Sequence, residues 1–282
     1  MDIRQLDTKE IKEAIAQMCI QVNEQLSPDM EGALLCAVRN EEDPVGKMVL
    51  ETLAKNLEIA RTEHVPICQD TGMAVVFIDI GQDVHLTGGD LEKAVNAGVA
   101  KGYTEGYLRA SVVRDPFDRV NTNDNTPAVI HTRIVPGDRV KITVAPKGAG
   151  SENMSTMAML KPADGIEGVK DYVLDVIRAA GPNPCPPLVV GVGVGGNFES
   201  APLLAKRALL RAVGDWSDRD DIRAMEEELL IRANELGIGP AGLGGRTGVL
   251  AVHVETAPTH IAQLPVAVAI CCHVNRHITR II

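Results

Sequence analysis

The chain is poor in aromatic side chains and has no long apolar run. Only 2% of its 282 residues are Phe, Trp or Tyr, whereas 45% are hydrophobic. A core of this composition must be built from Ala, Val, Ile and Leu, with Met filling gaps, which favours helices packed closely on sheets. No apolar stretch approaches the roughly 20 residues of a transmembrane helix, so we expect no membrane segment.

The chain also lacks the charge pattern of a nucleic-acid-binding protein. Its net charge is −10 and it has no long run of Lys or Arg, which excludes a nucleic-acid footprint. The N-terminal stretch "MDIRQLDTKEIKEAI" is charged and amphipathic, unlike a signal peptide, so we expect a cytoplasmic protein. In that compartment the six cysteines are expected to be core residues or metal ligands rather than disulfides.

Hydrophobic periodicity predicts helices first and a mixture of strands and helices afterwards. Residues 1–62 have apolar positions at helical spacing, and Ser27-Pro28 and Asp43-Pro44 are typical helix starts. Later patterns predict strands at 74–80, 140–145, 188–194, 249–255 and 265–272, and helices at 90–108, 164–180, 202–213 and 219–237. We therefore expect an α/β fold of mixed α+β type. In it a helical region, 1–62, packs on a main body, 63–282, with mixed sheets flanked by helices, and the two form one compact catalytic domain.

Two polar or glycine-rich segments invite functional interpretations. The segment 114–131 is polar and long, and long ordered loops are commonly functional. Gly191, Gly193 and Gly196 have the G-x-G-x-x-G spacing of a dinucleotide-binding loop. However, Pro202 starts the next helix several residues late, and no second strand ends in an acidic residue about twenty residues on. The glycines could instead allow close packing of a strand, or Gly195-Gly196-Asn197 could line an anion pocket.

The stretch "GPAGLGGRTG" (239–248) resembles a phosphate-binding loop but fails its pattern twice. Pro240 stands at the first glycine position and Arg246 replaces the lysine. A nucleotide site is therefore not expected here.

Cysteines in three separate segments suggest a metal site. Cys68 precedes Gln69 and Asp70 at the start of an apolar run, and Cys185 lies among prolines in "GPNPCPP". Cys271 and Cys272 end another apolar run, and on a strand only one of the two faces a given site. A zinc site would need a second pair of ligands at short spacing, which is absent. Three thiolates can instead hold an iron–sulfur cluster with one open iron, which is a Lewis acid.

Six stretches together resemble the class I, iron–sulfur-dependent fumarate hydratases, specifically the α subunit of the two-subunit form. They are "ICQDTG", "NTNDNTPAVIH", "KGAGSENMS", "NPCPPLVVGVGVGGNFE", "GPAGLGGRTG" and "PTHIAQLPVAVAICCHVNRH". The resemblance implies an oxygen-sensitive hydro-lyase of the tricarboxylic acid cycle that reversibly hydrates fumarate to (S)-malate. The alternatives are an L(+)-tartrate dehydratase α subunit, a non-catalytic metal-binding scaffold or a nicotinamide oxidoreductase.

The resemblance also implies a role for individual residues. The implied metal ligands are Cys68, Cys185 and Cys272. Cys272 is chosen over Cys271 because His260 lies twelve residues before it, which is the family's spacing between the catalytic histidine and the third ligand. Cys271 is then a packing residue. Asp70 and His260 are the implied catalytic pair, although Asp70 could simply form an Asx-turn before Gly72 and His260 could be a hydrogen-bonded core histidine. The implied substrate contacts are Gln69, Arg109 and Gly150.

The implied cofactor is a 4Fe-4S cluster with three cysteine ligands and one open iron. The family's single-chain members carry a second domain that we do not expect here, so the resemblance implies a β subunit that completes the active site. It also implies homodimerisation of the α subunit and a small dicarboxylate as the substrate.

Overall fold

A computed structural model describes residues 3–282, and contacts between Cα atoms divide the chain into two compact units. The first unit comprises the chain up to Ser27, Leu57–Ala149 and Arg276–Ile282. The second comprises Pro28–Asn56 and Gly150–Asn275. Each unit has its own hydrophobic core.

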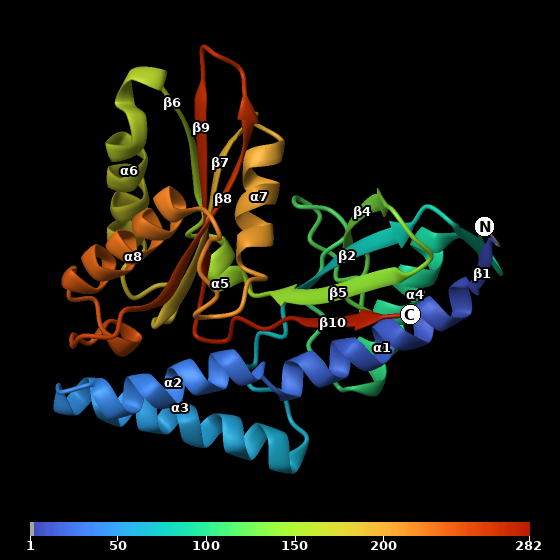
Figure 1. The fold of residues 1–282 in the computed structure, drawn as a ribbon. Coiled ribbons are helices and arrows are strands. Elements are labelled where there is room, and N and C mark those ends of the chain that lie inside the picture. The colour runs from blue at the N-terminus through green and yellow to red at the C-terminus, as the bar shows by residue number, and fades with distance from the viewer. Residues whose placement is uncertain (1–2) are drawn as a thin grey trace. The chain divides into compact units, whose positions relative to one another are not determined.

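The first unit is built on a mixed four-stranded sheet with the strand order β10-β5-β2-β4 (Figure 1). Its strands are β2 (Met73–Gly81), β4 (Val129–Val135), β5 (Val140–Lys147) and β10 (Ile278–Ile281). Strand β2 runs parallel to β4 and antiparallel to β5, and β10 runs antiparallel to β5. A separate parallel pair joins β1 (Arg4–Asp7) to β3 (Val84–Thr87).

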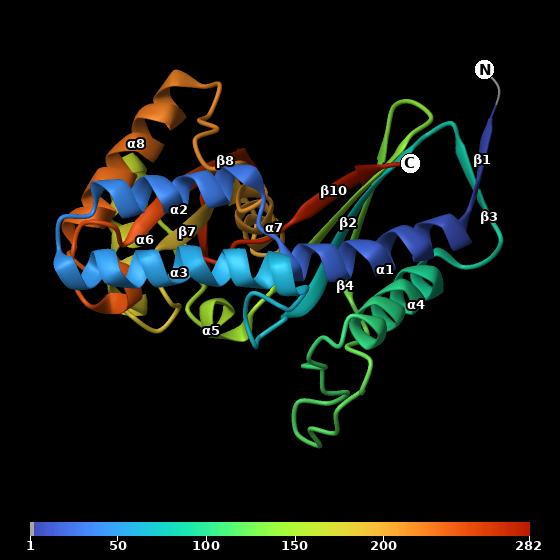
Figure 2. The same cartoon turned by 90° about the horizontal axis from the view of Figure 1, so that it is seen from below.

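Helices α1 (Thr8–Glu24) and α4 (Leu91–Glu105) pack together and contribute to the core of this unit (Figure 2). Alternate residues of β2, beginning with Ala74 and Val76, point into that core as the period of a strand requires. The two helices approach closely because α4 has glycines where they meet. A Cβ added at Gly98 or Gly102 would lie 2.6 Å from a carbonyl oxygen of α1.

The second unit has a four-stranded sheet with the order β6-β9-β7-β8. Its strands are β6 (Thr156–Leu160), β7 (Leu188–Gly196), β8 (Val249–Thr259) and β9 (Leu264–Cys271). Strand β7 is parallel to β8, and β9 is antiparallel to both β6 and β7. Helices α6 (Gly165–Ala180) and α8 (Asp220–Glu235) lie on one face of the sheet and α7 (Ser200–Ala208) on the other (Figure 1).

Gly191 and Gly193 lie inside β7 and point toward α7. A Cβ at Gly191 would lie 2.2 Å from the carbonyl oxygen of Ala205, and one at Gly193 would lie 2.2 Å from that of Ala201. The spacing of these glycines is therefore explained by a helix packed against a strand. This is the alternative that the sequence left open beside dinucleotide binding.

The remaining helices are α2 (Pro28–Asn40), α3 (Pro44–Glu63) and the short α5 (Ala149–Glu152). Pro28 and Pro44 each occupy the first helical position, which confirms the helix starts predicted from the sequence. Two 3₁₀ turns cover Pro162–Asp164 and Pro240–Gly242.

The fold confirms the expected mixed α/β class. All five predicted strands and the four later helices are present, with shifted ends, while β1, β3, β4, β6 and β10 were not predicted. None of the six cysteines, all of which lie within residues 3–282, forms a disulfide. Within residues 3–282, no helix combines the length and apolar character needed to cross a lipid bilayer.

Candidate active site

The segment Cys68–Gly72 is a loop of the first unit that leads directly into β2. The Cys68 thiol is partly exposed, and its sulfur accepts the backbone N–H of Asp70 at 3.4 Å. The same thiol lies 3.4 Å from Oε1 of Gln69, whose side chain is exposed. A cysteine that is partly exposed in an ordered loop is accessible to a metal.

Three buried polar side chains hold this loop by its carbonyl oxygens. The Tyr103 hydroxyl donates to the carbonyls of Thr71 at 2.7 Å and Gly72 at 3.1 Å. The Asn125 amide donates to the Gly72 carbonyl at 3.0 Å, and Arg276 Nη2 donates to the Asp70 carbonyl at 2.6 Å. Because buried carbonyls without partners are costly, these donors fix the path of the loop.

The carboxylate of Asp70 is bound by two backbone amides. Oδ1 accepts the N–H of Gly72 at 3.0 Å, which is the Asx-turn that the sequence allowed. Oδ2 accepts the N–H of Ala149 at 2.9 Å, and Gly148 lets the chain approach, since an added Cβ would lie 3.1 Å from Oδ2. Asp70 thus has a structural role, and a catalytic role would be additional to it.

Arg109 is joined to the same loop by its backbone. Its carbonyl accepts the hydroxyl of Thr71 at 3.1 Å, while its side chain is exposed. The structure therefore brings Cys68, Gln69, Asp70 and Arg109 together in the first unit. The neighbouring polar segment 114–131 contributes Asn125, whose Oδ1 accepts the N–H of Ser111 at 2.7 Å.

Cys185 lies in a turn of the second unit just before β7. Its φ is +56°, in the left-handed region, its N–H donates to the Pro182 carbonyl at 3.1 Å, and its thiol is exposed. The Cys185 carbonyl contacts His273, whose backbone N–H lies at 3.4 Å and whose Nδ1 lies at 3.0 Å. His273 directly follows Cys272, so Cys185 and Cys272 lie at the same end of the sheet.

The register of the strands agrees with this placement. Val189, near the start of β7, pairs with Cys271, the last residue of the antiparallel β9. Cys271 is buried, as expected of a packing residue, whereas Cys272 is partly exposed. Gly150 lies near the same turn, because a Cβ added there would be 3.9 Å from the Asn183 carbonyl.

His260 lies at the opposite end of β9, in the turn that follows β8. The eight residues of β9 separate it from Cys272, and at about 3.3 Å per residue this is roughly 25 Å. The His260 ring is exposed and its Nδ1 accepts the N–H of Ala262 at 3.2 Å, which leaves the proton of a neutral ring on Nε2. Within one chain the structure does not bring His260 to Cys272.

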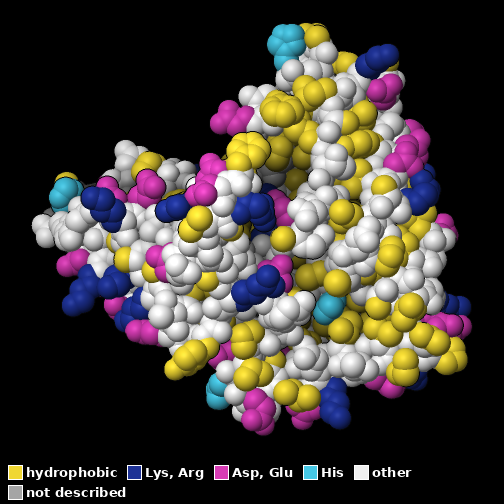
Figure 3. All heavy atoms as spheres, turned by 180° about the vertical axis from the view of Figure 1, so that it is seen from behind, with side chains coloured by type: hydrophobic (Ala, Val, Ile, Leu, Met, Phe, Trp, Pro, Cys, Tyr) yellow, Lys and Arg dark blue, Asp and Glu magenta, His cyan; other side chains and the backbone are white. Residues whose placement is uncertain are grey.

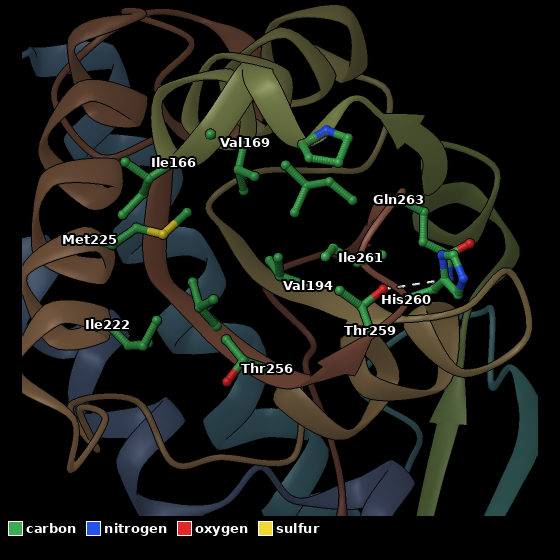
Figure 4. A pocket seen from close by; sticks show the side chains of 14 residues that line it. Ile166, Val169, Val194, Ile222, Met225, Thr256, Thr259, His260, Ile261 and Gln263 are labelled. Atoms are coloured by element: carbon green, nitrogen blue, oxygen red, sulfur yellow. Dashed lines mark hydrogen bonds between the residues drawn. The ribbon is translucent and has the colours of Figure 1, made fainter.

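His260 borders a pocket of about 410 Å³ (Figure 4). Aliphatic side chains such as Ile166, Val194 and Met225 form most of its wall, and Thr259 and Gln263 lie beside His260. Hydrophobic side chains also gather on the face of the second unit that Figure 3 shows. No Lys or Arg lines the pocket, so it lacks the cations that a dicarboxylate needs.

The donor set suits an iron–sulfur cluster by its chemistry. Cys68 belongs to the first unit, and Cys185 and Cys272 belong to the second. None of the three is in a disulfide and each is at least partly exposed, and soft thiolates are the usual ligands of such clusters. Within residues 3–282, no three His, Cys, Asp or Glu side chains are grouped as metal ligands, so the set of three thiols stays a prediction.

Sequence reasoning missed the residues that support the site. Tyr103, Asn125 and Arg276 are polar side chains in otherwise unremarkable segments, and each is almost fully buried. Nε and Nη1 of Arg276 are buried without a hydrogen-bond partner. The only signal in the sequence was that Asn125 lies in the polar segment and Arg276 in the stretch after Cys272.

Comparison with known proteins places the chain among hydro-lyases. Residues 12–281 match the family described as "Fumarate hydratase (Fumerase)". The chain is 42% identical over 259 residues to a putative L(+)-tartrate dehydratase subunit alpha from Methanocaldococcus jannaschii, covering 89% of this chain and 90% of that protein. It is 31% identical over 277 residues to the L(+)-tartrate dehydratase subunit alpha of Escherichia coli strain UTI89, covering 97% and 91%.

Proposed function

The chain belongs to the fumarate hydratase (Fumerase) family, and from that premise we propose that it is the α subunit of a fumarate hydratase. It is a hydro-lyase, and in this proposal its substrates are fumarate and (S)-malate. The observation that carries the proposal is the ordered loop Cys68–Gly72, which presents a thiol, an amide and a carboxylate within three residues. The family match over nearly the whole chain supports it.

We propose that Cys68, Cys185 and Cys272 hold a 4Fe-4S cluster. When bound, its open iron would supply a Lewis acid for the hydroxyl group that is added or removed. The chain's own residues would bind the carboxylates of the substrate: the guanidinium of Arg109, the amide of Gln69 and the exposed backbone at Gly150. A guanidinium suits this task because it donates two parallel hydrogen bonds to a carboxylate.

Asp70 and His260 are the proposed acid–base residues, but the structure restricts how His260 could act. Its distance from Cys272 along β9 is too large for one imidazole to serve a site beside that thiol in the same chain. The proposal therefore assigns His260 to the site of a second copy of the chain, which agrees with the expected homodimer. The β subunit would supply the remaining substrate contacts, in keeping with the relatives' names as alpha subunits.

Mixing two inactive variants tests this assignment. Cys272→Ser and His260→Ala chains are co-expressed with the β subunit, and hydration of fumarate is measured anaerobically. If His260 acts on a second copy, random pairing restores roughly a quarter of the wild-type activity, because half of the dimers are mixed and each has one complete site. Activity no higher than that of either variant alone would contradict the assignment.

A second candidate, L-tartrate dehydration, is favoured by the printed names of the relatives. The experiment that decides compares kcat/KM for (S)-malate or fumarate with that for L-tartrate, using the anaerobic complex with the β subunit. The proposal predicts the higher value for fumarate and a loss of activity in air. A higher value for L-tartrate would overturn the fumarate assignment and leave the reaction class unchanged.

A further inference from the structure

Glu41 is a buried carboxylate in the connection between α2 and α3. Its side chain is only 3% exposed, yet no Lys, Arg or His side chain is its hydrogen-bond partner among the contacts that the structure records. Instead it accepts backbone N–H groups: that of Arg246 at 3.0 Å to both oxygens, that of Thr247 at 3.0 Å, and that of Asp43 at 3.1 Å.

The amides of Arg246 and Thr247 belong to the stretch Gly239–Gly248, which resembles a phosphate-binding loop in sequence. Its successive N–H groups form a concavity for an anion, and the Glu41 carboxylate is the anion. Gly245 has a φ of +102° and permits the approach, since an added Cβ would lie 2.9 Å from Oε1 of Glu41. Burial raises the pKa of Glu41, but hydrogen bonds from the amides of Arg246, Asp43 and Thr247 and from the Thr247 side chain together outweigh burial and hold the pKa below its ordinary value.

The other side of this loop lies against the turn that carries Cys185. The N–H of Ala241 donates to the Pro186 carbonyl at 2.9 Å, and the N–H of Leu188 donates to the Gly248 carbonyl at 2.9 Å. On the opposite flank of Cys185, a Cβ added at Gly242 would lie 2.3 Å from Cβ of Pro182. The loop thus contacts the turn before and after the thiol.

We propose that Glu41 is a positioning residue for Cys185: it holds the loop Gly239–Gly248, and the loop holds the Cys185 turn so that its thiol stays beside Cys272. The expected effect of Glu41 on cluster binding rests on the proposed function, whereas its effect on the position of the Cys185 turn does not. Helix α2 is also attached independently, because Asp29 accepts the N–H of Val213 at 2.8 Å. Replacing Glu41 is therefore expected to loosen the loop without releasing the helix.

Hydrogen exchange of the purified chain without iron tests the link directly. In Glu41→Gln the amides of Ala241, Leu188 and Cys185 should exchange about tenfold faster than in the wild type. Glu42→Gln is the matched control, because the neighbouring Glu42 pairs with Arg246 at 2.9 Å on the surface, where both side chains are about 70% exposed. Its exchange should equal that of the wild type.

One further variant and one further measurement distinguish a positioning role of Glu41 from a general effect on stability. Glu41→Asp keeps the carboxylate on a shorter side chain and should give intermediate exchange at Cys185; it also serves as the test if Glu41→Gln does not fold. After anaerobic incubation with iron and sulfide, the complex with the β subunit should bind less iron in Glu41→Gln than in Glu42→Gln.

The inference is overturned if exchange quickens at Arg246 and Thr247 while Cys185, Leu188 and Ala241 keep wild-type rates. It is also overturned if Glu41→Asp and Glu41→Gln both match the control. If the exchange results agree with the inference but the wild-type complex binds no iron, the proposed function fails and the link between Glu41 and Cys185 stands.

Discussion

Two of the thiol-bearing segments of this chain, the loop with Cys68 and the turn with Cys185, are held in different ways. The loop Cys68–Gly72 is fixed by side chains, since Tyr103, Asn125 and Arg276 donate to its carbonyl oxygens. The Cys185 turn is fixed by another stretch of backbone that is rich in glycine and anchored by a single carboxylate. The first arrangement depends on a few buried polar side chains, and the second on positions where a side chain is absent.

This difference predicts different sensitivities to substitution. Adding a methyl group should destabilise the Cys185 region, because backbone segments there are already in contact. Removing a hydroxyl or amide should destabilise the Cys68 region, because a buried carbonyl would lose its hydrogen-bond donor.

The largest effect is expected for Gly242→Ala. Gly242 has a φ of +75°, and the new Cβ would lie 2.3 Å from Cβ of Pro182. Gly237→Ala is the matched control, since Gly237 has a φ of +68° but no atom within 4 Å of the added Cβ. We expect a loss of unfolding free energy of about 2–4 kcal/mol for Gly242→Ala and about 1 kcal/mol for Gly237→Ala, measured by denaturant titration. Equal losses would show that the loop does not press on the Cys185 turn.

A smaller effect is expected for Tyr103→Phe in the other region. The change removes the hydroxyl that donates to the carbonyls of Thr71 and Gly72, and Gly72 keeps the Asn125 amide. Chemical denaturation should show a loss of about 1–2 kcal/mol. Tyr107→Phe alters a side chain that is 94% exposed and should change stability by less than about 0.5 kcal/mol. If the two variants unfold alike, the hydroxyl does not hold the loop.

The smallest effect is a pH dependence that arises from Glu41. The pKa of Glu41 is lower in the folded chain than its ordinary value of 4.5. Its contribution to stability is therefore complete above pH 4.5 and is lost as the pH falls through the folded pKa. The stability difference between the wild type and Glu41→Gln should stay constant from pH 7 to about 5 and shrink below that, by an amount on the order of 1 kcal/mol. A difference that grows with acidity would contradict the assigned direction.

Local patterns were enough to predict much of the fold. Alternating or continuous apolar runs identified β2, β5, β7, β8 and β9, and the prolines at residues 28 and 44 marked two helix starts. The short strands β1 and β6 were missed because four or five residues carry little pattern of their own. They are strands because they pair with distant segments, β1 with β3 and β6 with β9.

The candidate site was predicted only in part. Cys68, Gln69 and Asp70 are neighbours in sequence, so their proximity could be predicted. The prediction that only one of Cys271 and Cys272 faces a given site agrees with the burial of Cys271 and the partial exposure of Cys272. Nothing local to Glu41 shows that two of its partners, the amides of Arg246 and Thr247, lie some 205 residues later, because those contacts depend on the tertiary fold. The separation of His260 from Cys272 could have been predicted, since the strand expected at 265–272 already places them at its opposite ends.

The central claim is that three thiols, with Cys272 rather than Cys271 as the third, bind an iron–sulfur cluster. The most direct test is the iron content of the anaerobically reconstituted complex with the β subunit, for Cys272→Ser and its neighbour Cys271→Ser. We predict that Cys271→Ser keeps the wild-type iron content and that Cys272→Ser loses most of it while remaining folded. Equal iron content in both variants, or no iron in the wild type, would contradict it.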